Sequence, residues 1–239
     1  MDNTEKEYKK KLAEKQAEIK ILQKIIETVS YNWDLKDILQ SVIKIVHAYT
    51  KSDSCLIYLI DHSQLILKAS QNPHRPLGKI TLQKGEGITG WVAKHKKTVM
   101  LPQKAYNDER FKLFNNLPED QFESFLSVPV IFKNNVIGVI NIQNRRQRKY
   151  LKNQILFLEA IGRQVGGAIE NARLVSETNM LKEALETRKI VEKAKGILMH
   201  KNGLTEVEAH KLLNKKSMDV RKSLKEVAEA VILIHEIEN

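Results

Sequence analysis

The chain has only one cysteine, Cys55, among its 239 residues. A single cysteine cannot form a disulfide within the chain, and it cannot supply a zinc site made of several cysteines. Long hydrophobic runs are missing too, because the longest, residues 55–60, is far shorter than the roughly 18 residues that span a membrane. The first 15 residues contain no apolar stretch of the signal-peptide type. We therefore expect a cytoplasmic protein without a membrane partner.

Signatures of catalysis and metal binding are also missing. The seven histidines show no H-E-x-x-H or other ligand spacing, and the Walker motif G-x-x-x-x-G-K-[ST] does not occur. No combination of nucleophile, histidine and acid suggests a catalytic constellation. We therefore expect neither an enzyme nor a metalloprotein. Cys55 lies in an apolar run, so we expect it to be a buried small hydrophobic residue.

Positive charge is what the chain has in excess. Lys and Arg number 40 against 29 Asp and Glu, which gives a formal net charge of +11. Such an excess favours an anionic partner such as RNA, DNA, anionic lipid or a phosphorylated ligand. Apolar residues make up 42% of the chain, which is enough for the cores of one or two globular domains.

Helical periodicity marks the N-terminal segment. Apolar residues alternate at spacings of four and three, interrupted by Lys15, and predict a helix with a heptad seam: Tyr8, Leu12, Ile19, Leu22, Ile26 and Val29. A second helix is expected to begin at the N-cap residue Asp34. Its predicted apolar face consists of Leu35, Ile38, Leu39, Val42, Ile43, Val46 and Tyr49.

Short β-rich runs follow between residues 52 and 144, separated by turn-prone residues. The last two runs are joined by Lys133-Asn134-Asn135, which predicts an antiparallel hairpin with a three-residue connection. Gly85, Gly87 and Gly90 match G-x-G-x-x-G, a dinucleotide-binding pattern, but no repeated βαβ units surround them. We therefore interpret these glycines as a turn that starts a short helix.

A long helix is predicted next, because residues 151–200 contain no proline and keep helical spacing. One apolar stripe runs along the first half of this helix, and Leu174, Leu181 and Leu185 continue it on a slightly rotated face. A helix of up to about 50 residues would be about 75 Å long at 1.5 Å per residue, which one small domain cannot cover. The simplest partner is the same helix of a second subunit, so we expect a homodimer that the N-terminal seam also joins. The first stripe consists of Ile155, Leu158, Ile161, Val165, Ala168, Ala172 and Val175.

The C-terminal region shows clear helix boundaries. Asn202-Gly203 predicts the end of the long helix. Thr205 and Ser223 are each followed three residues later by Glu, which predicts two capping boxes. The three resulting helices would form a small all-α module. Their expected apolar faces are Ile190, Ala194, Ile197 and Leu198, then Val207, Ala209, Leu212 and Leu213, then Leu224, Val227, Ala228, Val231, Ile232 and Ile234.

Basic residues concentrate on this module. Residues 188–225 contain eleven basic and four acidic residues, a net charge of +7, whereas residues 226–239 carry −4. Solvated helix faces could explain such a cluster, but its restriction to the first two helices favours a surface that follows phosphates. A second basic cluster is interpreted as a solvated loop, with nucleic acid or an anionic ligand as the alternative: Arg145, Arg146, Arg148, Lys149 and Lys152.

The middle region resembles a GAF domain in four segments: GEGITGWVAKHKKTVMLP (85–102), NDERF (107–111), FLSVPVIFKNNVIGVINI (125–142) and FLEAIGRQVGGAIENARL (157–174). The resemblance implies a six-stranded antiparallel sheet with helices on one face and a ligand pocket on the other, and frequent dimerisation through terminal helices. Trp91, Tyr106, Arg110 and Phe111 lie in segments that commonly border the pocket, so they are candidates for binding a small-molecule effector. The N-K-x-F-x-D-E pattern of cyclic-nucleotide sites is not recognisable, which leaves the effector unnamed.

The tail from about Leu181 to Ile234 resembles an ANTAR domain, the RNA-binding module of bacterial transcription antiterminators. Its most specific segment is AKGILM (194–199), whose Gly196 is expected to let helices approach closely. The family often has an aromatic residue where His210 stands, and an aromatic ring there could stack on an unpaired RNA base. The resemblance implies that a dimer binds paired hairpins in a leader transcript, so that a terminator hairpin does not form. The expected RNA-binding residues are Arg188, Lys193, Lys195, Lys201, His210, Lys211, Lys215, Lys216 and Arg221.

The predicted fold class is α+β, with a GAF-type antiparallel sheet and flanking helices, a long connecting helix and a C-terminal all-α three-helix module. The expected parts are a coiled-coil-like helix (1–33), a GAF sensor (34–174), a helical linker (175–187) and an ANTAR domain (188–239) whose first helix continues the linker from about residue 181. The expected function is a signal-responsive antiterminator that binds RNA hairpin loops. The alternatives are a DNA-binding transcription regulator and a non-catalytic dimeric sensor or scaffold that binds a protein.

Overall fold

The computed structural model describes residues 3–31, 34–72, 77–111 and 122–238. The chain divides into two compact units, which we call unit 1 (Met1–Arg173) and unit 2 (Leu174–Asn239). Helix α4 (Lys152–Asn202) begins in unit 1 and ends in unit 2, so the predicted long helix is confirmed. Each unit is described separately below.

Unit 1 contains a six-stranded sheet whose strands pair antiparallel in the order β3-β2-β1-β6-β5-β4. This confirms the predicted sheet. The β5–β6 turn is tighter than expected, because Asn135 already pairs with Phe132 and only Lys133-Asn134 connect the strands. The left-handed backbone of Lys133, with φ 53°, suits such a two-residue hairpin. The strands are β1 (Ser54–Asp61), β2 (Gln64–Ser70), β3 (Thr81–Gln83), β4 (Val99–Leu101), β5 (Ser124–Phe132) and β6 (Asn135–Asn144).

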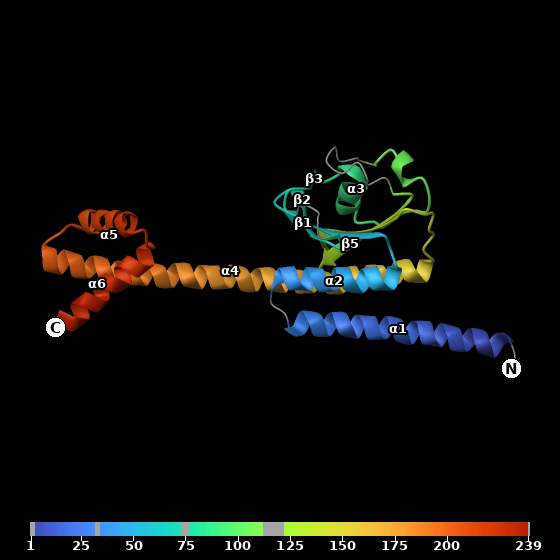
Figure 1. Ribbon diagram of the computed structural model, residues 1–239, viewed down its shortest axis with the longest axis horizontal. Coiled ribbons are helices and arrows are strands. Elements are labelled where there is room, and N and C mark those ends of the chain that lie inside the picture. Colours follow the sequence, from blue (N-terminus) through green and yellow to red (C-terminus); the bar gives the residue numbers. More distant parts are fainter. Residues whose placement is uncertain (1–2, 32–33, 73–76, 112–121, 239) are drawn as a thin grey trace. The chain divides into compact units, whose positions relative to one another are not determined.

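Helices cover both faces of this sheet (Figure 1). Helix α2 (Leu35–Thr50) and the first part of α4 pack on one face, while α3 (Gly87–His95) and the short helix η1 (Ala105–Asn107) lie on the other. Side chains alternate along β1, so Cys55 and Ile57 join the core under α2, while Leu56 and Tyr58 join the core under α3. A Cβ on Gly162 of α4 would lie 2.5 Å from the Pro129 carbonyl oxygen, so only glycine permits this close packing on β5.

Local predictions for unit 1 hold at several residues. The Asp34 side chain accepts hydrogen bonds from the first turn of α2, as expected of an N-cap. Cys55 is fully buried, and this burial raises the pKa of its thiol to about 12. The glycine turn closes on itself, because the Gly85 amide donates to the Gly90 carbonyl oxygen at 2.8 Å. Positive φ values at Gly85 and Gly87, 99° and 67°, explain why the turn requires glycine.

Within unit 1, helix α1 (Asn3–Tyr31) packs mainly through a face that lies beside its heptad seam, and Leu22 of the seam also contacts the core. Ile25 is fully buried in the core under α2, and Glu18 accepts a hydrogen bond from the Tyr49 hydroxyl of α2 at 3.2 Å. Most of the described seam residues remain on the surface, with exposed fractions of 73% for Tyr8, 60% for Leu12 and 55% for Ile19. Helix α1 therefore has one apolar face that is used within the unit and a second that is exposed.

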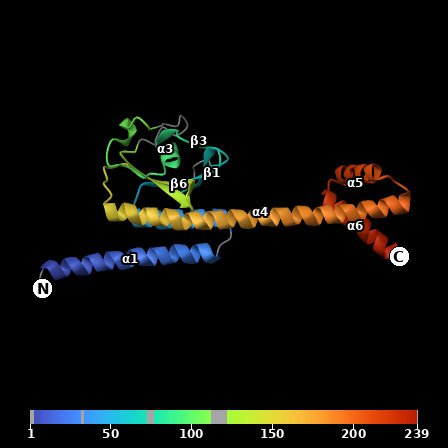
Figure 2. The same ribbon diagram turned by 180° about the vertical axis from the view of Figure 1, so that it is seen from behind.

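Unit 2 consists of the end of α4 with α5 (Glu206–Val220) and α6 (Leu224–Glu238), which flank it in both views (Figures 1 and 2). Both predicted capping boxes are present: Thr205 and Glu208 exchange hydrogen bonds at the start of α5, and Ser223 and Glu226 do so at the start of α6. Gly203, with φ 65°, follows the end of α4 as expected.

The core of unit 2 is small. Its buried members are Val191, Ala194, Leu213 and Ala228, with partly buried Ile190, Leu198, Leu224, Val227, Val231 and Ile232 packed against them. Three expectations were wrong: Val207 and Ile234 are 64% and 55% exposed, and Gly196 faces open space. Three short helices have few positions that face one another, so the predicted apolar faces exceed what the unit can bury.

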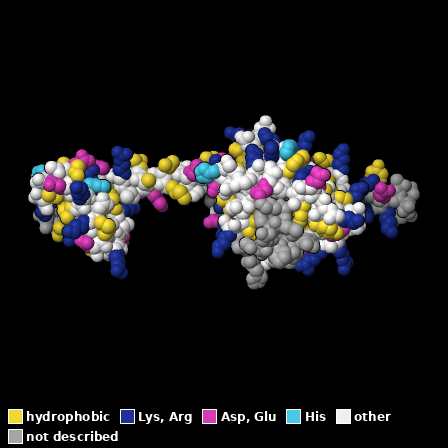
Figure 3. All heavy atoms as spheres, turned by 90° about the horizontal axis from the view of Figure 1, so that it is seen from above, with side chains coloured by type: hydrophobic (Ala, Val, Ile, Leu, Met, Phe, Trp, Pro, Cys, Tyr) yellow, Lys and Arg dark blue, Asp and Glu magenta, His cyan; other side chains and the backbone are white. Residues whose placement is uncertain are grey.

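An exposed apolar stripe lies on α4 before this core. Leu174, Leu181 and Leu185 are 48%, 72% and 55% exposed and lie on one side of the helix. Figure 3 shows yellow hydrophobic side chains at the surface along this part of α4. Among the residues that the structure describes, no helix is both long enough and apolar enough to cross a membrane.

Candidate nucleic-acid interface

A groove of about 680 Å³ lies on unit 2 between α4, α5 and the start of α6. We call it the α4–α5 groove. Arg188 and Lys211 contribute positive charge to it, and Val191, Val207 and Leu224 contribute apolar surface. Its remaining residues are Ala184, Thr187, Glu192, Lys195, Glu206 and His210. An apolar surface beside cations suits a ligand with a flat apolar face and a negative charge.

Helix geometry explains why these side chains meet. On α5, Val207, His210 and Lys211 are three and four residues apart, so they share one face. The Thr205–Glu208 capping box fixes where α5 begins and therefore which way this face points. Hydrogen bonds to Thr205 lower the pKa of the Glu208 carboxyl, so the cap is ionised at neutral pH.

Among the predicted RNA-binding residues, Lys195 has the most unexpected surroundings. Its side chain is only 8% exposed, and its ammonium lies 2.8 Å from Glu206 and 2.9 Å from Glu192. The hydrogen bonds that Lys195 donates to Glu206 and, to a lesser extent, to Glu192 raise the pKa of its ammonium. The ammonium is thus already held by two carboxylates. The sequence predicted an exposed Lys195 because it does not show that Glu192 of α4 and Glu206 of α5 meet at this side chain.

His210 stands where the sequence departs from the aromatic residue that is frequent in the ANTAR family. Its side chain is exposed, lines the α4–α5 groove and lies 3.3 Å from the amide nitrogen of Asn214. This contact orients the imidazole ring from one turn further along α5. The structure therefore brings Arg188, His210 and Lys211 together at one groove.

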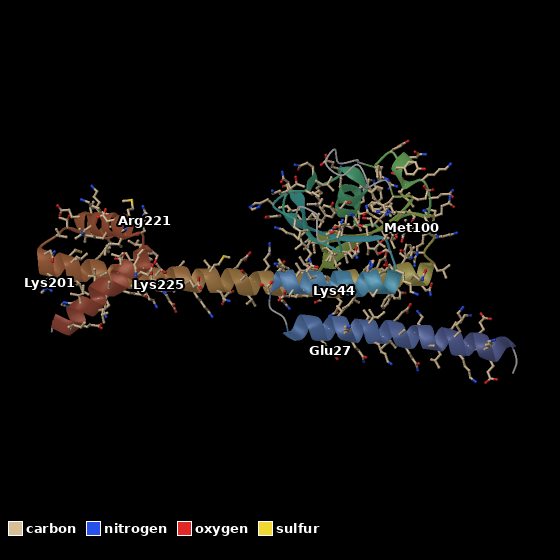
Figure 4. The ribbon with its side chains drawn as sticks, in the orientation of Figure 1. Glu27, Lys44, Met100, Lys201, Arg221 and Lys225 are labelled. Atoms are coloured by element: carbon tan, nitrogen blue, oxygen red, sulfur yellow. The ribbon has the colours of Figure 1, made fainter. Side chains whose placement is uncertain are left out.

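The other predicted residues lie outside this groove. Lys193 forms an ion pair with Glu236 of α6 at 2.9 Å. Lys215 and Lys216 are exposed on α5, and Figure 4 shows Lys201 near the end of α4 and Arg221 at the end of α5. Arg221 is the left-handed C-cap of α5, with φ 53°.

Several residues of the groove were not predicted from the sequence. Val207 was assigned to the core, and Ala184, Thr187 and Leu224 were not considered as site residues. An apolar residue at a helical position indicates burial or a binding surface equally well. The usable signal was the position of Val207 two residues after the capping residue Thr205, in the first turn of α5.

In unit 1 the structure brings three of the four effector-binding candidates close together. The Arg110 guanidinium lies 4.9 Å from the centroid of the Trp91 ring, and Asp108 holds it with two bonds of 2.8 Å. Trp91 and Phe111 both pack on the core under α3. Tyr106 is 42% exposed, and the nearby charge of Glu123 raises its pKa. Within the described residues, no group of three or more His, Cys, Asp or Glu could hold a metal ion.

The second basic cluster is exposed at four of its five side chains, and Arg148 is the partly buried member. Arg148 donates to the Lys51 carbonyl oxygen at 3.1 Å, and its guanidinium lies 4.8 Å from the Tyr150 ring centroid. Lys149 and Lys152 line a second cavity, of about 580 Å³, beside Tyr150. Arg148 therefore anchors this connection onto unit 1.

Comparison with known proteins supports both resemblances. The GAF domain model matches residues 34–169, and the ANTAR domain model matches residues 179–232. The transcriptional regulatory protein PdtaR of Mycobacterium tuberculosis is 48% identical over 63 residues, which cover 26% of this chain and 31% of that protein. The phosphoenolpyruvate-dependent phosphotransferase system protein of Escherichia coli is 27% identical over 158 residues, 65% of this chain and 21% of that one. The chain thus spans a third or less of these curated relatives.

A solved structure extends the comparison of unit 1. The GAF domain of Acinetobacter phosphoenolpyruvate-protein phosphotransferase is 30% identical, with a TM-score of 0.59, over 67% of this chain and 98% of that one. The fold of unit 1 and the two matched segments agree with both resemblances. The chain belongs to the GAF domain family and carries an ANTAR domain after its GAF domain.

Proposed function

We propose that this protein is a transcription antiterminator that binds hairpin RNA through the α4–α5 groove of its ANTAR domain. In this function a signal sensed by the GAF domain controls RNA binding, and the chain itself performs no catalysis. A bacterial cytoplasmic regulator would act in this way. The ANTAR match and the similarity to PdtaR, a transcriptional regulatory protein, support the proposal.

The α4–α5 groove is the observation that carries this proposal. Unpaired hairpin bases present a flat apolar face beside a charged backbone, and proteins recognise them by stacking and by cationic contacts to phosphates. The groove offers an imidazole at His210 and apolar surface at Val207, with cations at Arg188 and Lys211. Lys201, Lys215, Lys216 and Arg221 would contact phosphates outside the groove.

We further propose that the protein is a homodimer, and exposed apolar stripes on two helices support this. The seam of α1 includes Tyr8, Leu12 and Ile19, and the stripe of α4 includes Leu181 and Leu185. The exposed residues of each stripe recur four and seven residues apart, as they do along the seam between two packed helices. A second copy of the chain would cover both stripes, which makes it their simplest partner.

Control by the GAF domain is proposed to act through α4. This helix is continuous from Lys152 to Asn202, so a change at the GAF domain could reach the ANTAR domain as a small shift or rotation. The candidate effector contacts are Trp91, Arg110 and Phe111, with the exposed Tyr106 at their edge. Native mass spectrometry of the purified protein tests for a retained small molecule, and its mass would identify the effector.

The direct test of RNA binding compares two ligands of similar charge. We expect a leader-type RNA hairpin to bind the full chain more tightly than a DNA duplex of equal phosphate count. Affinity should fall as salt rises, with a log–log slope of about −0.7 for each single-strand phosphate contact.

Two results would contradict the proposal. Preference for the DNA duplex would make the three-helix tail a DNA reader, and indifference to both nucleic acids at physiological salt would favour a protein partner. An RNA hairpin with the same stem but an abasic loop serves as the matched control, because the groove is proposed to bind a loop base.

A further inference from the structure

Lys195 is a buried cation that joins two helices of unit 2. Its Nζ atom lies 2.8 Å from Oε1 of Glu206, and 2.9 and 3.0 Å from the two carboxylate oxygens of Glu192. Glu192 lies one turn before it on α4, whereas Glu206 is the first residue of α5. The ammonium therefore connects α4 to the start of α5.

Two carboxylates already engage this ammonium, so it has little to offer a third anion. Its side chain is 8% exposed, and contact with an RNA phosphate would require it to give up a partner. Without Lys195, Glu192 and Glu206 would leave two uncompensated negative charges on the α4–α5 groove that they line. Such charges would repel RNA.

We propose that Lys195 is a positioning residue, which holds the first turn of α5 on α4 so that Val207 and Lys211 face the groove beside Arg188. This inference rests on the proposed RNA-binding function. It replaces the phosphate contact expected from the sequence with an indirect role in the same activity.

Substitution of Glu206 separates the two roles by the sign of its effect. If Lys195 contacts phosphate, Glu206→Gln releases the ammonium and removes a repulsive charge, so hairpin RNA should bind more tightly. If Lys195 positions α5, the same substitution weakens RNA binding. We expect a loss of about tenfold, the size of a coupling between two contacting residues. Glu186→Gln, on an exposed part of α4, is the control of equal charge change.

Lys195→Met adds a second measurement, the salt dependence of RNA affinity. A positioning role and a direct phosphate contact predict different results for it. We expect weaker RNA binding with an unchanged slope of log affinity against log salt concentration, because no phosphate contact is lost. A direct contact would instead reduce that slope by about 0.7. The double variant Lys195→Met with Glu206→Gln should bind no more weakly than Lys195→Met alone, since both changes break one link.

Hydrogen exchange of the full chain tests the link without RNA. In Lys195→Met the amides of Ala209 to Lys211 should exchange faster than in the unmodified protein. Unchanged exchange there, tighter RNA binding by Glu206→Gln, or a reduced salt slope in Lys195→Met would each overturn the positioning role. If the unmodified protein fails to bind hairpin RNA, the proposed function is wrong, and exchange still decides whether Lys195 links the helices. If Lys195→Met fails to fold, Glu206→Gln carries the test.

Discussion

The GAF and ANTAR domains are stabilised in different ways. Unit 1 buries large apolar side chains on both faces of a sheet, in two clusters that include Leu126 and Ile140 on one side and Leu65 and Val92 on the other. Among its described residues, unit 2 buries only five apolar side chains, all of them small or medium-sized: Val191, Ala194, Ala209, Leu213 and Ala228. It relies on two capping boxes and on the ion pairs of Lys195. Small cores are marginal, so unit 2 depends on individual polar contacts.

The two regions also differ in how charge relates to the proposed function. Residues 1–180 carry a net charge of +9, whereas residues 181–239 carry only +2. The proposed RNA interface nevertheless lies in the second region, because most of the acidic residues of that region lie in 226–239 or engage in caps and ion pairs. Local arrangement, rather than net charge, indicates the interface.

The largest expected effect is the loss of stability when a buried leucine is replaced by alanine in the core of each unit. Leu213→Ala removes a buried side chain of unit 2 and should cost about 3 kcal/mol, enough to remove exchange protection throughout α5 and α6. Leu126→Ala should cost a similar amount, but unit 1 should stay folded because its core is much larger. Hydrogen exchange measured on both variants checks this. Protected α5 amides in Leu213→Ala would show that unit 2 is more robust than its core suggests.

A smaller effect is expected from breaking the exposed stripe on α4. Leu181→Lys places a charge on the stripe and should raise the dissociation constant of the proposed dimer about tenfold or more, as loss of a central interface side chain does. Met180→Lys makes the same kind of change about 100° around the helix and should have little effect. Analytical ultracentrifugation measures both. Equal effects of the two variants would argue against the stripe as the interface.

The smallest expected effect is that of mild acid. Hydrogen bonds with Lys195 lower the pKa of Glu206, and hydrogen bonds with Thr205 and Ser223 lower those of Glu208 and Glu226. Depressed carboxyl pKa values stabilise the fold above the ordinary value of 4.5, and this stabilisation is lost as pH falls through the lower folded values. Unit 2 should therefore loosen in acid before unit 1. Exchange rates measured from pH 6 downward check the order, and simultaneous loosening would contradict it.

Helix boundaries and the sheet were predictable because local chemistry determines them. Asp34, Thr205 and Ser223 act on backbone groups within three residues, so the sequence alone shows where those helices begin. The β5–β6 turn was predicted one residue too long, because strand pairing at Asn135 depends on its partner Phe132.

The candidate site was predictable only in part, because it depends on which helix faces meet. Arg188, His210 and Lys211 were named from their residue type and motif, and the structure groups them. The ion pair of Lys195 was not predicted because Glu206 lies eleven residues away in sequence, and Val207 was predicted to join a core that is too small to bury it. Neither the ion pair of Lys195 nor the exposure of Val207 follows from helical spacing alone.

The measurement that tests the central claim most directly is hairpin-RNA affinity as a function of salt for two matched double variants. Arg188→Met with Lys211→Met removes two cations from the α4–α5 groove, and Lys44→Met with Lys79→Met removes two exposed cations from unit 1. The groove variant should bind far more weakly and reduce the log–log salt slope by about 1.4, or 0.7 for each contact, whereas the unit 1 variant should bind nearly as the unmodified protein does. Equal losses in the two variants would show that RNA responds to net charge and would contradict the assignment of the groove.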